Sequence, residues 1–329
     1  MPPLSLLDLA PICQGGNITA ALDNSRNMAI AAEKYGYKRI WLAEHHGMQG
    51  VASSATALAI SHIAAATNSI RVGSGGIMLP NHSPLIIAEQ FGTLDALYPG
   101  RIDLGLGRAP GTDMATARAL RRNMDASVEE YPQNIRELQL FLGPTQTEQK
   151  IIAVPGQNSN IPLWLLGSSL YSAQLAAQMG LPYSFASHFA PDQLLDAISL
   201  YRDGFKPSMQ SDKSYVSAGL MAVVADSDEQ ANYLFSSVQQ QFINLRRGAN
   251  QPFQPPVDSM QGLWSEAERV MVNHTLQYAL VGSPATVKDK LKRFVAATGV
   301  DEVIVSMPIY DIEARLHSLA LLAQCENSV

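Results

Sequence analysis

Short apolar segments alternate with longer amphipathic segments along the whole chain, and this rhythm restricts the fold more than any other feature. The apolar segments have the length of strands, and the segments between them carry apolar residues at helical spacing. The predicted strands are residues 4–10, 37–43, 70–75, 101–106, 161–166, 182–186, 215–224 and 301–307. Strands that are each followed by a helix pair in parallel, and eight such units in 329 residues favour a closed (β/α)8 TIM barrel over an open sheet.

The predicted helices lie between these strands, and one region breaks the alternation. Helices are expected at residues 17–34, 53–66, 84–97, 113–141, 169–179, 191–201, 228–242, 283–297 and 312–323. Residues 245–276 contain the stretch NQPFQPPVD, whose prolines and polar residues are typical of a loop. We therefore predict that residues 1–329 form a single barrel domain, with an insertion at 245–276 before the last βα unit.

Charge and cysteine content exclude several classes of function. The formal net charge is −6 and no Lys/Arg block is present, which argues against binding to nucleic acid or to an anionic membrane. No apolar stretch approaches the roughly 20 residues that a membrane-spanning helix requires. The two cysteines, Cys13 and Cys325, form no CxxC motif, and the N-terminus lacks the basic region of a signal peptide. We expect a cytoplasmic protein.

Three titratable side chains, Glu44, His45 and His46, directly follow the second predicted strand. In a barrel, the functional residues collect at the carboxyl ends of the strands. A metal site is weakly indicated, because neighbouring residues of an extended segment point to opposite faces and no thiolate partners exist. A structural corner is the plain alternative for each histidine alone. For the three residues together we predict a catalytic role.

The stretch GRIDLGLGRAPG at residues 100–111 superficially imitates a dinucleotide-binding fingerprint. The third glycine comes one residue late, and no acidic residue ends a following strand at the required distance, so we reject that assignment. Arg108 between two turns suits an anion such as phosphate, although an ion pair with Asp103 or Asp113 is the alternative.

Two further small-residue turns follow predicted strands. Gly167, Ser168 and Ser169 precede a predicted helix, whose free N–H groups, together with the hydroxyls of Ser169 and Ser172, could bind an anion; the alternative is simple N-capping. With Arg108, this turn predicts a cofactor that carries phosphate. The run from Ser74 to Gly76 would let a flat ring approach the backbone, and its alternative is a β-bulge.

Four segments together resemble the bacterial luciferase-like flavin monooxygenases: WLAEHH, VGSGGIMLPNHSP, PGRIDLGLGRAPGTD and SSLYSAQLAAQMGLP. The resemblance runs in order from about residue 4 to residue 325 and is closer to uncharacterised bacterial members than to the light-emitting subunits. It implies a (β/α)8 barrel that binds FMN, or in some branches the deazaflavin F420, at the barrel top. Gly107 stands where the light-emitting subunit has a reactive cysteine, so light emission is not expected.

The resemblance also implies roles for particular residues. His45 matches the catalytic histidine of the light-emitting α subunit, and His46 matches its neighbour. A non-proline cis peptide is implied between Gly75 and Gly76, beneath the flavin ring. The expected phosphate-binding residues are Arg108, Ser168, Ser169 and Ser172, with Ser74, Gly75 and Gly76 at the ring. Strand-end positions make Asp8, His188, Met307 and Tyr310 the expected walls of the substrate pocket.

The function that follows is a two-component monooxygenase, which would use O2 and reduced FMN from a separate flavin reductase to oxidise a small organic substrate. The chain has no pyridine-nucleotide fingerprint of its own, as expected for such a system. A homodimer is expected. Two alternatives remain open: an F420-dependent oxidoreductase of the same fold, and a non-catalytic protein that binds or stores flavin.

Overall fold

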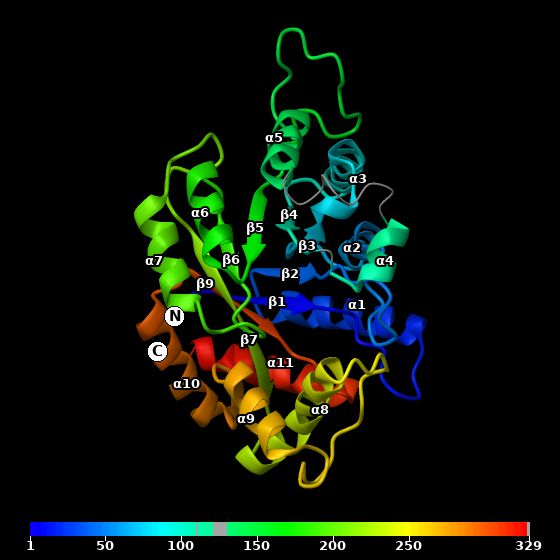
Figure 1. The fold of residues 1–329 in the computed structure, drawn as a ribbon, viewed down its shortest axis with the longest axis vertical. Helices are drawn as coiled ribbons and strands as arrows, with labels where there is room; N and C mark the ends of the chain where they lie inside the picture. Colours follow the sequence, from blue (N-terminus) through cyan, green and yellow to red (C-terminus); the bar gives the residue numbers. More distant parts are fainter. Residues whose placement is uncertain (110, 121–129, 328–329) are drawn as a thin grey trace.

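The computed structural model describes residues 1–109, 111–120 and 130–327, and it shows a closed parallel barrel surrounded by helices (Figure 1). Strand pairing runs in the order β6-β5-β4-β3-β2-β1-β9-β7, and a further pairing of β6 with β7 closes the ring. The (β/α)8 TIM barrel is therefore confirmed. Its strands are β1 (Leu4–Asp8), β2 (Arg39–Leu42), β3 (Arg71–Met78), β4 (Ile102–Gly107), β5 (Leu163–Gly167), β6 (Tyr183–Phe185), β7 (Val216–Val224) and β9 (Glu302–Ser306).

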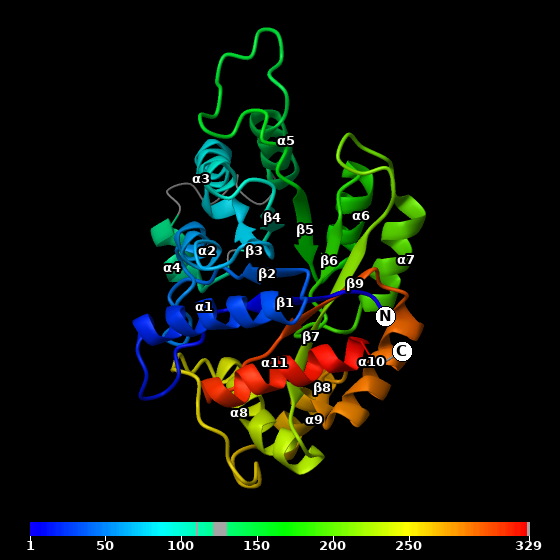
Figure 2. The ribbon, with the colours of Figure 1, turned by 180° about the vertical axis from the view of Figure 1, so that it is seen from behind.

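Helices cover the outer face of the barrel, and their apolar sides form its main hydrophobic core with the outward side chains of the strands. Figure 2 shows α1 and α11 side by side across one face, and both chain ends lie near that side of the molecule. The helices are α1 (Ile18–Lys34), α2 (Thr56–Ala64), α3 (Pro84–Leu97), α4 (Met114–Leu120), α5 (Tyr131–Leu142), α6 (Leu170–Met179), α7 (Leu194–Gly204), α8 (Asp228–Arg246), α9 (Glu266–Thr275), α10 (Pro284–Thr298) and α11 (Ile312–Asn327), with a 3-10 turn, η1 (Leu79–Asn81).

Several helices begin and end where local side-chain chemistry favours it. The Asn17 side chain accepts a hydrogen bond from the Ala20 amide at 2.9 Å and starts α1. Ser265 and Glu268 form a capping box at the start of α9. Gly180 and Gly299 end α6 and α10 in the left-handed conformation, which glycine adopts without a steric penalty.

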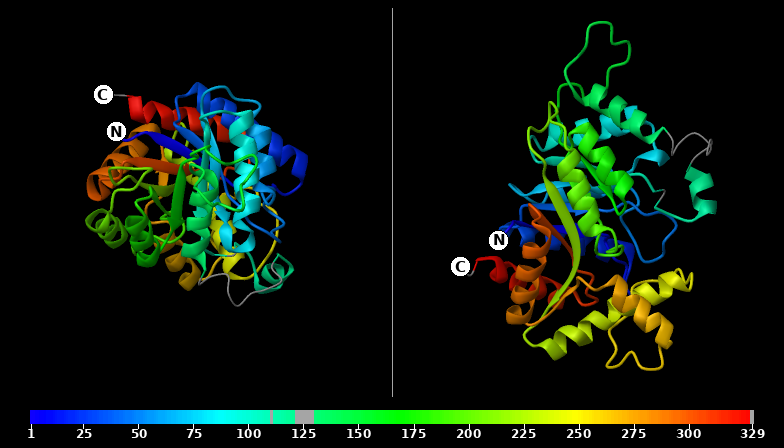
Figure 3. Two further views of the ribbon diagram at one scale, coloured as in Figure 1. Left: turned by 90° about the horizontal axis from the view of Figure 1, so that it is seen from above. Right: turned by 60° about the vertical axis from the view of Figure 1, so that its left-hand side comes forward.

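Four segments differ from the sequence-based expectation. β3 continues through Gly75 and Gly76 to Met78 rather than ending at them, with a shift in pairing register between Ser74 and Ile77. The segment 245–276 holds helix α9 as well as loop, and in Figure 3 it lies with α8 at one end of the molecule. A short strand, β8 (Leu280–Gly282), extends the pairing of β7 outside the ring. The predicted helix 113–141 covers α4 and α5, and its middle, 121–129, lies outside the described residues.

Side chains along β2 alternate between the helix layer and the barrel interior. Ile40 and Leu42 belong to the core beneath the helices, whereas Trp41 and Ala43 pack inside the barrel with Trp164. The Trp41 and Trp164 rings meet edge to face, with centroids 5.1 Å apart. The middle of the barrel is therefore filled by aromatic rings, and a ligand in its interior can approach only from the ends.

Below this aromatic layer, at the amino end of the strands, lies a buried ion network centred on Arg39. Its Nε donates to Glu302 Oε1 at 2.8 Å, and its Nη1 donates to Asp103 Oδ2 at 2.5 Å. Glu302 also accepts hydrogen bonds from Ser5 Oγ at 2.6 Å and from Tyr215 OH at 2.9 Å. Each buried charge thus has opposite charges and donors around it, as burial of an ionised group requires.

Among the described residues, no helix is both long enough and apolar enough to cross a bilayer.

Candidate active site

The segments that follow β2 and β6 carry two histidines, His45 and His188, whose Nδ1 atoms are buried. His45 lies three residues after the end of β2, and His188 lies three residues after the end of β6. Neither His45 Nδ1 nor His188 Nδ1 has a hydrogen-bond partner among the described residues, although both atoms are buried. A buried polar atom without a protein partner is uncommon and indicates a position that a ligand can satisfy.

Both imidazoles are held in the neutral form at neutral pH. Burial lowers the pKa of His45. Burial, and secondarily the nearby His45, lowers the pKa of His188 to about 4. A neutral imidazole has one donor and one acceptor nitrogen, so each ring can both give and take a proton.

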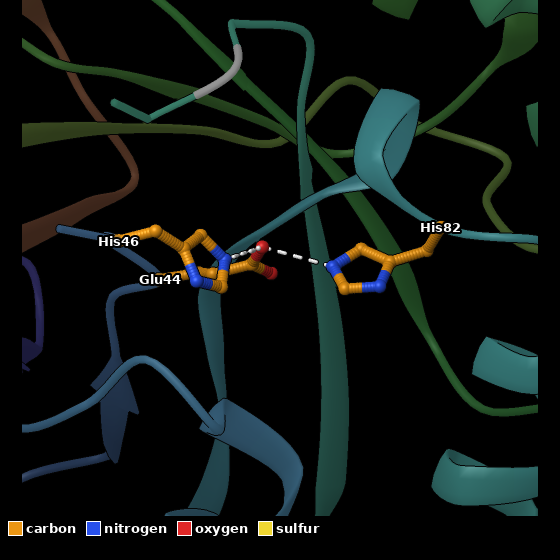
Figure 4. A group of neighbouring side chains, drawn as sticks. All are labelled: Glu44, His46 and His82. Carbon is orange, nitrogen blue, oxygen red and sulfur yellow. Dashed lines mark hydrogen bonds and ion pairs between the residues drawn. The ribbon is translucent and has the colours of Figure 1, made fainter. Parts of the chain in front are cut away.

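The carboxylate of Glu44 connects two further histidines at the same barrel end (Figure 4). Its Oε1 lies 2.7 Å from His46 Nε2 and 2.8 Å from His82 Nε2, and its Oε2 accepts a hydrogen bond from the Met78 amide at 3.0 Å. Burial alone would raise the pKa of Glu44, but the hydrogen bonds from His82, His46 and Met78 hold it below the ordinary value. The side chain, 1% exposed, therefore remains a buried anion.

His82 was not singled out by sequence reasoning. It follows η1, after the end of β3, and the fold brings it to Glu44 from 38 residues away. The only sequence signal was its place in the segment VGSGGIMLPNHSP, which carried the family resemblance as a whole. Of the predicted trio, Glu44 and His46 therefore join His82 in one hydrogen-bonded group, and His45 Nδ1 stays outside it.

The two central glycines of β3 lie where side chains would collide. A Cβ at Gly75 would come within 2.6 Å of Leu7 Cδ1 and 2.9 Å of Trp41 Cβ, and one at Gly76 within 2.6 Å of the Gly105 carbonyl oxygen. The peptide bond between Gly75 and Gly76 is cis, as the resemblance predicted. The shift in pairing register between Ser74 and Ile77 corresponds to the β-bulge that was the alternative. Close packing against β1, β2 and β4 therefore requires glycine at both positions.

Arg108 lies beside the start of α6, as predicted. Its guanidinium carbon is 4.4 Å from the centroid of the Tyr171 ring, and Tyr171 belongs to the first turn of that helix. Neither suggested ion pair is present within the described part of the chain, because Asp103 pairs with Arg39 and Asp113 accepts hydrogen bonds from the first turn of α4. The charge of Arg108 is thus available next to a helix N-terminus.

The serines at this turn are partly engaged in capping. Ser169 is the N-cap of α6 and forms a capping box with Ser172, whose hydroxyl also donates to the Ser169 carbonyl at 2.7 Å and contacts Tyr183 OH at 2.9 Å. Ser168 makes no hydrogen bond within the described residues through its side chain. Capping, offered as the alternative reading, is therefore present, and anion binding would use Ser168, Arg108 and backbone amides.

Two of the predicted pocket residues point toward the helices instead. Leu7 and Ile304 pack inside the barrel, so their alternating neighbours Asp8 and Met307 face outward. Asp8 Oδ1 accepts a hydrogen bond from Arg315 of α11 at 2.8 Å, and Met307 belongs to the core beneath the helices. We correct the prediction on this point and leave both residues out of the pocket.

Tyr310 is held at the rim rather than in the interior. Its hydroxyl donates to the Gln14 carbonyl at 2.6 Å, and its own carbonyl accepts from Cys13 Sγ at 3.4 Å. These contacts tie the segment after β9 to the segment after β1. Of the four predicted pocket residues, His188 remains, and His45 lies near enough to lower its pKa.

Comparison with known proteins agrees with this fold. Residues 7–302 match the family model described as luciferase-like monooxygenase. A luciferase-like monooxygenase of Escherichia coli (strain K12) is 51% identical over 317 residues, which cover 96% of this chain and 95% of the relative. The N-acetyl-S-alkylcysteine monooxygenase of Bacillus subtilis (strain 168) is 28% identical over 333 residues, covering 97% of both.

A solved structure is similar over the whole chain. The crystal structure of apo-MsnO8 has a TM-score of 0.89 and 32% identity, and the match covers 100% of this chain and 99% of that one. The family model spans nearly all of the barrel, from β1 to the start of β9. The chain belongs to the luciferase-like monooxygenase family.

Proposed function

We propose that this protein is a flavin-dependent monooxygenase that uses O2 and reduced FMN, delivered by a separate flavin reductase, to oxidise a small organic substrate. The observation that carries the proposal is the pair of buried imidazole nitrogens, Nδ1 of His45 and Nδ1 of His188, that have no hydrogen-bond partner among the described residues. The name of the Bacillus subtilis relative, a monooxygenase that matches along the whole chain, supports the reaction class.

The residues present fit a flavin mononucleotide. Gly75 and Gly76 of β3 carry no side chains of their own, so a flat ring would meet only peptide groups at these two positions. Arg108 and the N-terminus of α6 offer a cation and free amides for the terminal phosphate. The aromatic layer of Trp41 and Trp164 closes the barrel beneath and excludes water from that side.

When bound, reduced FMN supplies the two electrons with which one atom of O2 enters the substrate while the other leaves as water. In this proposal the chain binds and orients the reactants and moves protons. His45, neutral at rest, would exchange a proton with the reactants through its imidazole, and His188 would orient the substrate by a hydrogen bond. A site closed beneath by aromatic rings would keep water from competing with the substrate.

The decisive experiment is an anaerobic titration with reduced FMN, followed by addition of labelled oxygen and candidate substrates. Small thioethers are the first candidates, because the Bacillus subtilis relative is named for an S-alkylcysteine. We expect saturable binding of reduced FMN and incorporation of one labelled oxygen atom per product. Binding of F420 but not FMN would replace the proposal by an F420-dependent oxidoreductase, and flavin binding without any substrate oxidation would indicate a storage protein.

Replacing Arg108 with alanine should weaken binding of reduced FMN by about 10- to 150-fold, because a charge-assisted phosphate contact contributes roughly 1.5–3 kcal/mol. The measurement is the Kd for reduced FMN compared with that for reduced riboflavin, which has no phosphate. Riboflavin affinity should be unchanged in the variant. Equal losses for both ligands would show that Arg108 does not contact the phosphate.

We further propose that the protein is a homodimer through α2 and α3, which pack side by side. Large apolar side chains of these helices are exposed: Leu58 at 74%, Ile86 at 50% and Leu97 at 59%. The double variant Leu58→Asp/Leu97→Asp should sediment as a monomer, because buried unpaired charges oppose association. An unchanged sedimentation coefficient relative to the parent protein would rule out this interface.

A further inference from the structure

The Glu44 carboxylate, with its two imidazoles and one backbone amide, joins the ends of neighbouring barrel strands. We propose that Glu44, His46 and His82 form a positioning clamp that sets the direction of the His45 ring without contacting the reactants. This inference rests on the proposed function, because His45 is the residue whose position matters. We call the three residues the Glu44 clamp.

Three hydrogen bonds hold the Glu44 carboxylate, and two of them are at Oε1. Oε1 lies 2.7 Å from His46 Nε2 and 2.8 Å from His82 Nε2, while Oε2 accepts from the Met78 amide at 3.0 Å. Figure 4 shows both rings directed at the carboxylate from opposite sides. A buried anion with several donors is rigid, because releasing any donor costs the carboxylate part of its solvation.

These contacts connect three successive strand ends. Glu44 follows β2, Met78 ends β3, and His82 lies just beyond it. The His46 amide donates to the Gly111 carbonyl at 3.3 Å, and Thr112 Oγ1 donates to the His46 carbonyl at 2.7 Å, so the segment after β4 is attached as well. The clamp therefore also fixes the backbone that follows Gly75 and Gly76.

His45 lies between Glu44 and His46, the two clamp residues that follow β2. Its own carbonyl accepts a hydrogen bond from Ser54 Oγ at 2.7 Å, so the backbone is fixed at this residue and on both sides of it. Its ring, by contrast, keeps Nδ1 without a partner among the described residues. An anchored backbone with an unengaged ring is what a proton-transfer group needs, since a displacement of about 1 Å can cost 10²-fold in rate.

A metal ion is the competing occupant of these three side chains, whose ligand atoms lie within 4.8 Å of one another. Four-coordinate zinc with ligands at about 2.0–2.1 Å would hold neighbouring ligand atoms roughly 3.3 Å apart. The observed separations of 2.7 and 2.8 Å are hydrogen-bond distances, with each Nε2 directed at the oxygen that it would have to share with the ion. The geometry therefore favours proton-mediated contacts.

The test compares the wild-type protein with Glu44→Gln, His82→Gln and the double variant. His317→Gln is the matched control, because His317 contacts Asp226 at 3.0 Å on the surface far from β2 in sequence. We expect Glu44→Gln to lower kcat by about 10²-fold with little change in the Kd of reduced FMN. His82→Gln should lower kcat by a smaller factor, and the control should leave it unchanged.

The double variant distinguishes a positioning role of His82 from general destabilisation of the protein. If His82 acts through Glu44, the double variant should be no slower than Glu44→Gln alone, whereas independent losses would multiply. Melting temperatures of all variants are measured in parallel. The clamp would be overturned if the kcat losses of the two single variants multiply in the double variant, or if the kcat losses parallel the losses in melting temperature. His82→Gln keeps the test open if Glu44→Gln does not fold, because the His82 side chain is 27% exposed.

NMR of the imidazole groups tests the clamp without a turnover measurement. Imidazole NMR should show protected Nε2–H signals for His46 and His82, their loss in Glu44→Gln, and a shifted His45 signal in that variant. An unchanged His45 signal would overturn the clamp even if the protein has no monooxygenase activity. About one metal ion per chain by elemental analysis, lost in His82→Gln, would overturn it in favour of a metal site.

Discussion

Replacing His45 with alanine is expected to lower kcat by about 10²–10⁴-fold, the usual contribution of a positioned acid–base group. The reason is the neutral imidazole of His45, whose buried Nδ1 has no hydrogen-bond partner among the described residues. Burial keeps its pKa below the ordinary value, so the ring is available as a proton acceptor at neutral pH. The measurement is substrate-dependent oxygen consumption at saturating reduced FMN.

Flavin binding provides the internal control for His45→Ala. The Kd of reduced FMN should change little, because the proposed phosphate contacts lie at Arg108 and α6. His317→Ala, which removes an exposed histidine of α11, should match the wild-type protein in both measurements. Unchanged turnover in His45→Ala would remove this residue from the mechanism and leave His188 as the candidate.

Replacing Glu302 with glutamine is expected to lower the free energy of unfolding by about 3 kcal/mol, the cost of leaving a buried cation partly unpaired. Glutamine keeps the shape of the side chain but removes the charge that balances Arg39, whose Nε and Nη2 both donate to Glu302. Both side chains are almost fully buried, so water cannot replace the lost charge. Urea denaturation followed by circular dichroism measures the difference.

The matched control for this prediction is Glu266→Gln, which removes one partner of an exposed ion pair with Arg269. Solvent screening makes such pairs contribute little, so its unfolding midpoint should stay close to that of the wild type. Equal losses in the two variants would show that the Arg39 network contributes no more than a surface pair. Retention of flavin binding in Glu302→Gln would place the network's role in stability alone.

The barrel could be predicted from the sequence because its signal is repeated in every unit. Strand segments of alternating or continuous apolar character recur between helices, and the bounds of α3, Pro84–Leu97, agree with the prediction at both ends. The elements that were missed lack such a signal. β8 has three residues, and α9 carries few buried side chains against which an apolar stripe could be recognised.

The candidate site could be predicted to the correct end of the barrel, but not to the correct face of each strand. Position after a strand indicated Asp8 and Met307, yet the direction of a side chain depends on its register with the interior residues, which one sequence does not reveal. His82 was missed because its partner Glu44 lies 38 residues away, and that proximity arises only when β2 and β3 pair.

The aromatic layer of Trp41 and Trp164 separates the two ends of the barrel interior. On one side lies the Arg39 network, which holds the strands together, and on the other lie His45 and His188. Substitutions around His45 and His188 therefore need not weaken the Arg39 network that stabilises the fold. Such a chain can acquire new substrates through substitutions in the segments after the strands, by drift or by directed evolution. Those substitutions leave intact the stability that the Arg39 network provides.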